Sequence, residues 1–296
     1  MSGTRDGSVL VEMPPFPRTP SLESLLTAIA AECRQVDLTD AVLRSGWENV
    51  VVETRDGWIV RFPRPGVDFE REMAVLRVLQ QRLPVPIPQV EWTGRLSRCA
   101  AYRKLTGSSF DATAYVSAPD AQRDSLAASL ADFLARMHTS LTPAEIEQLE
   151  LPRPVRSWDV TRIVAELGRV PADARPQIER LLDAVSTVAA ATGGPPVVLH
   201  NDFNSSNLVF SGPVGRLTGV WDFSCVEVGE PALDLRYFEG DSIDLLHRVA
   251  AAYERRTGRA LSSRTAILAN RLEAISDHLE LDEPERIVGT VRTWHE

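Results

Sequence analysis

The pattern of apolar and polar residues divides the chain into a strand-rich first third and a longer, mainly helical remainder. Short runs rich in β-branched and aromatic residues predict five strands in the first third. These strands are Val42–Arg44, Val50–Thr54, Trp58–Phe62, Gln89–Thr93 and Cys99–Leu105. Asp56-Gly57 is typical of a hairpin turn between the second and third strands. In the third strand the period of two predicts that Ile59 and Arg61 share one face.

Two helices accompany these strands. Ser21 is a suitable N-cap for a helix that runs to about Cys33. A second helix is expected over Val67–Arg82 because a proline-rich run follows it and ends it. The polar, proline-rich residues 1–20 predict a loose arm before the first helix.

Beyond Gly107 the apolar residues mostly follow a helical period. The predicted helices are Asp120–Thr139, Pro143–Leu149, Trp158–Leu167, Arg175–Ala191, Ser242–Arg256 and two more before the end of the sequence. A β-rich island over Val197–Asp222 interrupts them, with strands expected up to His200 and over Leu208–Phe210 and Leu217–Trp221. Polar residues gather at these strand ends, which is where functional sites usually lie.

The charge balance narrows the range of partners. The 296 residues include 41 acidic and 32 basic side chains, for a formal net charge of −9. Proteins that bind nucleic acid normally present a basic patch, and clustered basic residues also attract a protein to an anionic membrane. The sequence has no such cluster, so we expect neither nucleic acid nor a membrane as a partner. No protein partner is implied.

Cysteine and lysine usage excludes two further kinds of site. Cys33, Cys99 and Cys225 are too widely spaced for a disulfide framework or a paired metal motif. Together with the lack of a signal-peptide pattern, this predicts reduced thiols and a cytoplasmic location. Lys104 is the only lysine, so the chain has no P-loop Gly-Lys-Ser/Thr. Phosphate chemistry would need another scaffold.

Two motifs in the β-rich island predict chemistry. The first is His200-x-Asp202-x₄-Asn207, and the second places Asp222 between a hydrophobic residue and an aromatic one. Phosphoryl transfer needs a base to orient the acceptor hydroxyl and oxygen ligands for Mg²⁺ on the nucleotide phosphates. Asp202 can supply the base, while Asn207 and Asp222 offer hard oxygen ligands for Mg²⁺. The phosphate donor would be ATP or GTP.

These motifs resemble those of the aminoglycoside phosphotransferases and the related macrolide kinases. Gly229–Leu235 and Phe133–His138 resemble further segments of the family, and all of them occur in the family's order. The resemblance implies an α+β, two-lobed protein-kinase-like fold, with a small antiparallel β-rich N-terminal lobe and a larger helical C-terminal lobe. Residues 1–104 would form the nucleotide-binding lobe, and residues 105–296 would carry the catalytic loop and the acceptor site.

The resemblance also implies how phosphates are held. In the family a strand lysine holds the α- and β-phosphates and pairs with a helix glutamate. Arg61 occupies the lysine position here, which keeps the charge but changes the donor geometry. Glu72 occupies the glutamate position, with Glu70 as its competitor.

Further nucleotide contacts are expected from a loop and a hinge. Ser45 lies where the family's phosphate-covering loop should be, in a segment that has a single glycine. The hinge that binds the purine edge through main-chain groups should lie near Tyr102–Leu105, which makes Arg103 and Leu105 candidate contacts.

Several residues are expected to support the site or to bind the acceptor. His200 should stiffen the catalytic loop through a main-chain hydrogen bond, and Asp234 should cap or brace that loop. The acidic residues Glu227, Glu230, Glu239, Asp241 and Asp244 are either a solvated face or a cation-binding rim. Residues 1–104 hold 14 basic and 13 acidic side chains, whereas residues 105–296 hold 18 and 28. The net charge of −10 in the second part favours a cationic acceptor.

Family resemblance therefore implies Mg²⁺-dependent phosphorylation of a small cationic antibiotic, with an aminoglycoside as the expected substrate and resistance as the result. A macrolide, another antibiotic or a small metabolite is the alternative acceptor. A metal-dependent hydrolase would place His200, Asp202 and Asp222 directly on a metal, but the motif lacks the additional histidines that such sites use. A non-catalytic pseudokinase would have lost Asp202 or Asp222, and both are present.

Overall fold

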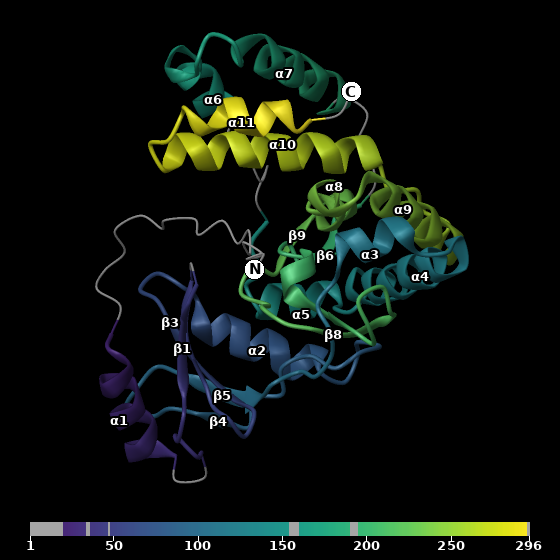
Figure 1. The fold of residues 1–296 in the computed structure, drawn as a ribbon. Helices are drawn as coiled ribbons and strands as arrows, with labels where there is room; N and C mark the ends of the chain where they lie inside the picture. Colours follow the sequence, from purple (N-terminus) through teal and green to yellow (C-terminus); the bar gives the residue numbers. More distant parts are fainter. Residues whose placement is uncertain (1–19, 34–35, 47, 154–159, 190–194, 295–296) are drawn as a thin grey trace, which may run out of the picture.

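The fold is known from a computed structural model that describes residues 20–33, 36–46, 48–153, 160–189 and 195–294. Within this part of the chain a β-rich N-terminal lobe lies beside a larger helical lobe (Figure 1). The predicted α+β architecture is confirmed. The predicted arm at residues 1–19, the residues around Trp158 and the end of the helix expected to reach Ala191 lie outside the described residues.

The N-terminal lobe contains an antiparallel sheet with the strand order β1-β2-β3-β5-β4. Its strands are β1 (Val42–Ser45), β2 (Asn49–Glu53), β3 (Trp58–Pro63), β4 (Trp92–Thr93) and β5 (Ala100–Arg103). The register places Val51 opposite Arg61 and Ile59 opposite Tyr102. The predicted lobe boundary falls directly after β5.

The two faces of this sheet have different partners. Helix α1 (Leu22–Glu32) covers one face, where Trp58 and Val60 join its apolar side chains in a buried cluster. Ile59 and Arg61 point to the other face, as the strand period predicts, because successive side chains alternate. Helix α2 (Phe69–Leu79) begins after its N-cap Asp68.

The C-terminal lobe is built from helices around two small β-ribbons. The α-helices are α3 (Ala112–Ser117), α4 (Asp120–Met137), α5 (Pro143–Gln148), α6 (Val160–Glu166), α7 (Arg175–Ala189), α8 (Phe238–Asp241), α9 (Ile243–Thr257), α10 (Ser263–Glu280) and α11 (Arg286–Arg292). In the described residues, 3₁₀ helices follow α6, β6 and β9: η1 (Leu167–Arg169), η2 (Ser205–Asn207) and η3 (Pro231–Leu235). The antiparallel ribbons pair β6 (Val197–Leu199) with β9 (Glu227–Gly229), and β7 (Leu208–Phe210) with β8 (Leu217–Val220).

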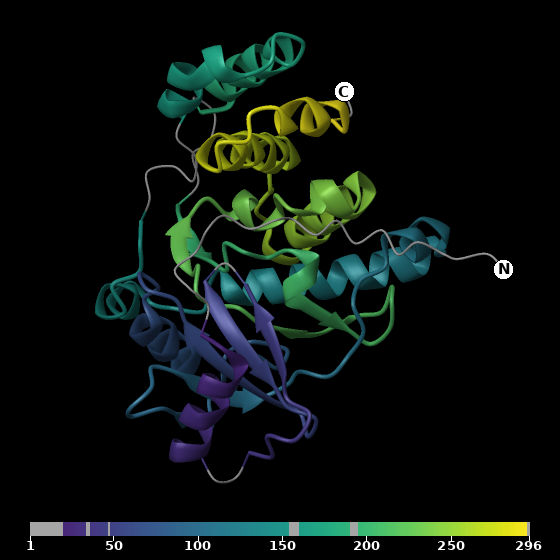
Figure 2. The same ribbon diagram turned by 60° about the vertical axis from the view of Figure 1, so that its left-hand side comes forward.

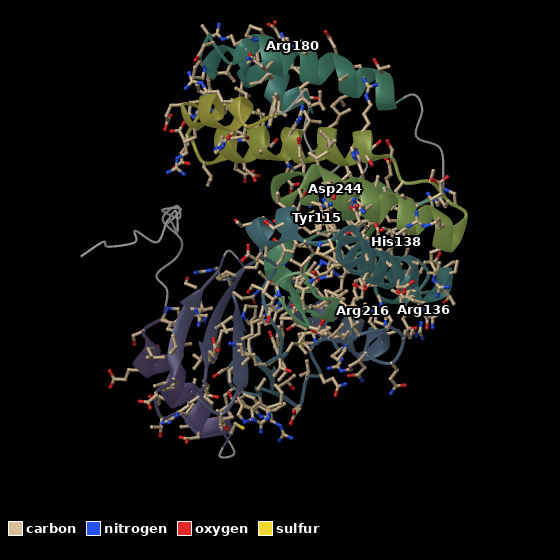
Figure 3. All side chains as sticks on the ribbon, turned by 45° about the vertical axis from the view of Figure 1, so that its right-hand side comes forward. Tyr115, Arg136, His138, Arg180, Arg216 and Asp244 are labelled. Atoms are coloured by element: carbon tan, nitrogen blue, oxygen red, sulfur yellow. The ribbon has the colours of Figure 1, made fainter. Side chains whose placement is uncertain are left out.

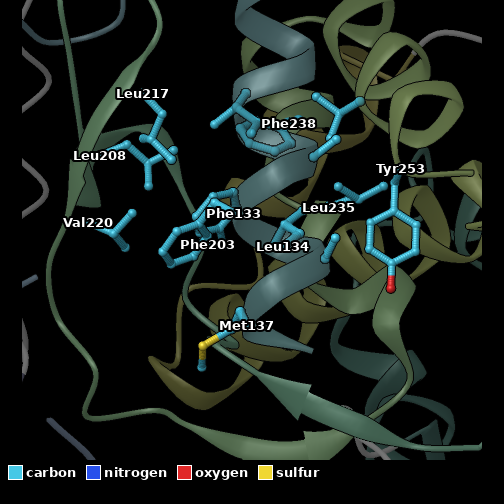
Figure 4. Packing of buried hydrophobic residues seen from close by; sticks show 14 of the residues in the cluster. Phe133, Leu134, Met137, Phe203, Leu208, Leu217, Val220, Leu235, Phe238 and Tyr253 are labelled. Atoms are coloured by element: carbon cyan, nitrogen blue, oxygen red, sulfur yellow. The ribbon is translucent and has the colours of Figure 1, made fainter. Parts of the chain in front are cut away.

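The main core lies directly beneath the loop that joins β6 to η2. Phe203 in that loop stacks on Phe133 of α4, with ring centroids 5.2 Å apart, and meets Phe238 edge-on (Figure 4). All three rings are fully buried. Aromatic packing of this kind contributes about 0.5–1.5 kcal/mol per pair beyond the burial of area. The residue after Asp202 thus anchors the predicted catalytic loop to the lobe.

A second apolar cluster joins α10 to α6, α7 and α11. Figures 1 and 2 show α6 and α7 on the side of α10 and α11 that faces away from the N-terminal lobe. On its other side α10 packs against η3, which follows the β6–β9 ribbon. Helix α10 therefore links this helical layer to the region of the catalytic loop. No helix in the described ranges is long and apolar enough to cross a membrane.

Candidate active site

A cavity of about 850 Å³ lies between the two lobes. The N-terminal sheet lines one side and the ends of the β-ribbons line the other. The lining side chains include Ser45, Asn49, Val51, Ile59, Arg61 and Tyr102 from the N-terminal lobe, and Asp202, Asn204, Asn207, Trp221, Asp222 and Tyr237 from the C-terminal lobe. The predicted base, the predicted metal ligands and the predicted phosphate-binding arginine therefore share one cavity.

Two amide side chains fix the carboxylate of Asp202. Asn204 Nδ2 donates to Asp202 Oδ1 at 2.7 Å, and Asn207 Nδ2 donates to Asp202 Oδ2 at 2.6 Å. Burial raises the pKa of Asp202, while His200 and these amide donors oppose that rise. Because the amide nitrogen of Asn207 faces Asp202, its carbonyl oxygen faces away from that residue and is available to a cation.

Asp222 lies at a sharp turn directly after β8. Its φ of 60° is in the left-handed region, which residues other than glycine rarely adopt and which is common at functional sites. The turn directs its carboxylate to the cavity, where Oδ1 accepts a hydrogen bond from Ser224 Oγ at 2.9 Å and lies 3.3 Å from Arg61 Nη1. Asp222 is thus placed between Arg61 and the predicted catalytic loop.

Arg61 forms a buried ion pair with Glu72 of α2. The residues are 5% and 1% exposed. Burial raises the pKa of Glu72, and the guanidinium limits that rise. Burial opposes the charge on Arg61, but Glu72, Tyr102 and Asp222 together outweigh it and raise the pKa of Arg61. Glu70 instead pairs with Arg98 at the surface, so the structure selects Glu72 as the partner of Arg61.

The buried pair retains unused hydrogen-bonding capacity. Arg61 Nε and Glu72 Oε1 are both buried and have no hydrogen-bond partner among the described residues. Leaving a buried donor without a hydrogen bond costs free energy, so such groups are rare in native structures and often mark a site for a ligand or ion. A phosphate oxygen would satisfy the guanidinium.

The loop between β1 and β2 is held by Arg64. Arg64 Nη2 donates to Ser45 Oγ at 2.6 Å, and Arg64 Nε donates to the main-chain oxygen of Gly46 at 3.0 Å. Ser45 lines the cavity, so the loop lies where the sequence predicts a phosphate-covering segment. Its contact with phosphate stays a prediction.

In the predicted hinge, Tyr102 and Lys104 line the cavity, whereas Arg103 and Leu105 do not. The guanidinium of Arg103 stacks on the ring of Trp58, 3.9 Å from its centroid, and donates to the main-chain oxygen of Asp56. Leu105 lies beside Gly219 of β8. A nucleotide contact at Arg103 or Leu105 would therefore use main-chain atoms.

A buried hydrogen-bond network supports the predicted catalytic loop. Asp234 accepts hydrogen bonds from the main-chain N–H groups of His200 and Asn201, at 3.1 and 2.7 Å. His138 Nε2 lies 3.1 Å from the same carboxylate, and its Nδ1 lies 2.8 Å from the hydroxyl of Tyr253. Burial opposes the charge on Asp234, yet these donors outweigh it and lower its pKa.

His200 completes this support. Its Nε2 lies 3.0 Å from the main-chain oxygen of Trp221, so the ring connects the predicted catalytic loop to the segment between β8 and Asp222. Phe203 and Phe223 surround the ring, and the residue is fully buried. This is the geometry that a structural rather than a chemical role requires.

The five acidic residues of the predicted rim are spread over β9, the residue before η3, α8 and α9. Glu239 accepts hydrogen bonds from Asn270 and Arg271, and Asp241 accepts one from Ser205 Oγ at 2.9 Å. Asp244 accepts a hydrogen bond from Tyr115 at 2.7 Å (Figure 3). Each of these three carboxylates accepts a hydrogen bond from a side chain on a neighbouring element. Their contact with a cationic substrate stays a prediction.

The other two members of that group are more enclosed. Glu227 is 8% exposed on β9, and burial raises its pKa to about 7. Glu230 precedes η3, and burial raises its pKa as well. Their contact with a substrate stays a prediction.

Sequence reasoning missed two carboxylates on α10. Glu273 Oε1 accepts a hydrogen bond from the hydroxyl of Tyr237 at 2.9 Å, and Tyr237 lines the cavity. Asp277 lies one turn further along, where partial burial and the neighbouring carboxylates raise its pKa to about 6, although its side chain stays partly exposed. The helical period predicts α10 itself, but not which of its faces packs against Tyr237.

The donor set fits a magnesium ion. Carboxylate and amide oxygens from Asp222 and Asn207 are the hard ligands that Mg²⁺ prefers, and nucleotide phosphates normally complete its shell. In the described ranges there is no group of three or more His, Cys, Asp or Glu side chains that could hold a metal. The protein would therefore supply part of the coordination and the nucleotide the rest.

Comparisons with known proteins show a matching family and a shared fold. The model of a family described as the phosphotransferase enzyme family matches residues 40–269. No curated protein matches the chain. Among solved structures, the GDP complex of aminoglycoside 2'-phosphotransferase-IIIa is similar, with a TM-score of 0.74 and 19% identity over 91% of this chain and 96% of that chain.

Two further solved structures, one of a macrolide enzyme and one of a gentamicin complex, also share the fold of this chain. The macrolide 2'-phosphotransferase MphH from Brachybacterium faecium has a TM-score of 0.64 and 20% identity, covering 93% of this chain and 100% of that chain. The gentamicin complex of APH(2")-IIa has a TM-score of 0.66 and 18% identity, covering 93% and 96%. At these identities the similarity shows the shared fold.

Proposed function

Since the chain belongs to the phosphotransferase enzyme family, we propose that it transfers the γ-phosphate of ATP or GTP to a hydroxyl of a small cationic antibiotic, with aminoglycosides as the first class to test. The observation that carries the proposal is the convergence of Asp202, Asn207, Asp222 and Arg61 on one cavity. Such a reaction would take place in the cytoplasm, where both nucleotides are available.

The residues take distinct roles in this reaction. The acceptor oxygen bonds to the γ-phosphorus, the bond to the β,γ-bridging oxygen breaks, and the nucleoside diphosphate leaves. Asp202 orients the acceptor hydroxyl and takes its proton, since two amides hold its carboxylate in one orientation. Arg61 binds the phosphates that face β3. Asn207 and Asp222 would hold Mg²⁺, which neutralises charge that develops on the phosphates.

Charge on the acceptor side supports a cationic substrate. Tyr237 lines the cavity that contains Asp202, and its hydroxyl donates a hydrogen bond to Glu273 of α10. Asp277 follows one turn later on the same helix. Residues 105–296 have a net charge of −10, from 18 basic and 28 acidic side chains. Opposite charge increases the encounter rate and the affinity for an amine-rich acceptor.

A macrolide is the second candidate. Such an acceptor carries a single amine and a large apolar ring, so it needs an apolar contact surface. The side chains of Trp221 and Tyr237 line the cavity and could provide that surface. Aromatic side chains provide large contact areas at little cost in conformational entropy.

A substrate screen tests the proposal. The protein is incubated with Mg²⁺, with ATP or GTP, and with panels of aminoglycosides and macrolides, and acceptor-dependent release of ADP or GDP is recorded. We expect stimulation by amine-rich members and phosphorylated product in the mass spectrum. Release that no acceptor stimulates, with either nucleotide, would overturn the proposed substrate class. Asp132→Asn, on the outer surface of α4, is a matched control that should behave as the wild type.

A further inference from the structure

One buried arginine outside the predicted motifs contacts both the loop that contains Asp202 and helix α10. Arg236 directly follows η3 and is 3% exposed. Its Nη2 donates to the main-chain oxygen of Asn201 at 2.6 Å, and its Nη1 donates to the side-chain Oδ1 of Asn201 at 3.1 Å. Nη1 also donates to the main-chain oxygen of Leu233 at 3.0 Å. One guanidinium thus holds both the backbone and the side chain of Asn201.

The other edge of the same guanidinium faces α10. Arg236 forms an ion pair with Glu273, and its Nη2 donates to the hydroxyl of Tyr237 at 2.9 Å. Tyr237 in turn donates to Glu273 Oε1 at 2.9 Å. These three side chains therefore form a closed set of hydrogen bonds. The planar fork of arginine makes such a set possible, whereas the single ammonium group of lysine cannot reproduce it.

Asn201 is the residue whose conformation most needs this support. It lies directly before Asp202 and has a φ of 63°, in the left-handed region. Asp234 holds its N–H at 2.7 Å, and Arg236 holds its carbonyl oxygen and its side chain. The peptide that leads into Asp202 is consequently fixed from both sides. A backbone held in a rarely populated region persists only when its surroundings determine it fully.

We propose that Arg236 is a positioning residue for phosphoryl transfer, which acts by fixing Asn201 so that the carboxylate of Asp202 meets the acceptor hydroxyl. Through Glu273 and Tyr237, Arg236 also links that orientation to α10, on the acceptor side. This inference rests on the proposed function of the cavity. A displacement of about 1 Å in a reacting group can reduce a rate about a hundredfold, so a residue that only positions can still control turnover.

The first test compares Arg236→Lys and Arg236→Met with the wild type. We expect kcat to fall about tenfold to a hundredfold, while the KM for nucleotide and the Kd for ADP change little, because the nucleotide contacts lie elsewhere. Arg236→Lys should recover little of the loss, since lysine lacks the fork. Arg248→Met is the matched control, because Arg248 also makes several ion pairs but with Asp120, Asp124 and Asp244 on the outer helices.

A double variant separates positioning from stability. Arg236→Met leaves Glu273 without its charged partner, so the melting temperature of this variant should fall. Arg236→Met with Glu273→Met removes both charges, which should restore much of the stability while kcat stays low. If kcat returns together with the melting temperature, Arg236 is merely structural and the inference is wrong. Asn201→Gly supplies an independent variant, because glycine keeps the left-handed backbone but lacks the Oδ1 acceptor.

Hydrogen exchange does not depend on activity, so it tests the role of Arg236 even if the proposed function fails. Hydrogen exchange of the peptide over residues 199–208 should be faster in the double variant than in the wild type. If the wild type transfers phosphate to no acceptor, the proposed function fails, and the exchange rates still decide whether Arg236 orders this loop. Unchanged exchange in the double variant would overturn the inference even in an active enzyme.

Discussion

The amide nitrogen of Asn207 lies 2.6 Å from Oδ2 of Asp202 and 3.0 Å from the main-chain oxygen of the same residue. One amide therefore orients the proposed base with its nitrogen and can offer its oxygen to a cation. The turn of η2 makes this possible, because it folds the chain so that residues five positions apart meet. The base and the metal ligand behave as a single unit.

Asn207→Ala should impair both parts of this unit. We expect kcat to fall about 10²- to 10³-fold, the loss typical for removal of one oriented donor at a reacting centre. The Mg²⁺ concentration that gives half-maximal activity should rise. Steady-state kinetics over a Mg²⁺ titration measures both effects. A variant with wild-type turnover and wild-type Mg²⁺ dependence would contradict the assignment.

Arg61→Met should destabilise the protein as well as weaken nucleotide binding. It leaves Glu72 buried without its charged partner, and breaking a buried pair in this way costs about 3–5 kcal/mol. Urea denaturation measures the free energy of unfolding. Combining Arg61→Met with Glu72→Met should recover most of the stability but not the ATP affinity. Glu70→Gln is the control, because its pair with Arg98 is exposed and should contribute little to stability.

Glu227 makes stability depend on pH. Its folded-state pKa of about 7 lies above that of an unfolded glutamate, so the native state binds the extra proton. Its contribution to stability is fully present below about pH 4 and is lost as the pH rises through about 7. Glu227→Gln should therefore be more stable than the wild type at pH 8, by on the order of 2 kcal/mol, and similar to it at pH 4.

Urea denaturation at several pH values tests this dependence. Glu147→Gln, on the exposed surface of α5, should follow the wild type at each pH. A Glu227→Gln variant that is less stable than the wild type at pH 8 would show that the carboxylate is needed in its charged form.

Asp277→Asn should affect the acceptor and leave the nucleotide unaffected. We expect the KM for a cationic acceptor to rise about two- to fivefold, which is the range for partly exposed charge pairs. The pKa of Asp277 is about 6, so the difference from the wild type should shrink as the pH falls below that value. Glu254→Gln on α9 serves as the control. An equal change in the KM for nucleotide would contradict the placement of Asp277 on the acceptor side.

The sequence was sufficient to predict the features that depend on local pattern. The alternation in Trp58–Phe62 placed Ile59 and Arg61 on one face, and the structure agrees, with both side chains on the cavity side. The spacing of Asp202, Asn207 and Asp222 likewise predicted a shared site, since each follows or precedes a short strand of one β-rich island.

Features that depend on packing between distant elements could not be predicted in this way. The family resemblance favoured Glu72 over its competitor Glu70, but the contact itself depends on the orientation of α2 on the sheet, which brings Glu72 to Arg61. The acidic residues after Asp222 suggested a rim, but Arg271 and Ser205 use two of them. Such pairings are fixed by tertiary contacts that leave no periodic signal.

Asp202→Asn tests the central claim most directly, because it keeps the size of the side chain and removes its ability to take a proton. The measurement is single-turnover transfer of the γ-phosphate to a substrate identified by the screen, alongside the Kd for ADP. The account predicts that transfer slows about 10²- to 10⁴-fold while ADP binding is unchanged. Transfer by Asp202→Asn at the wild-type rate would contradict it.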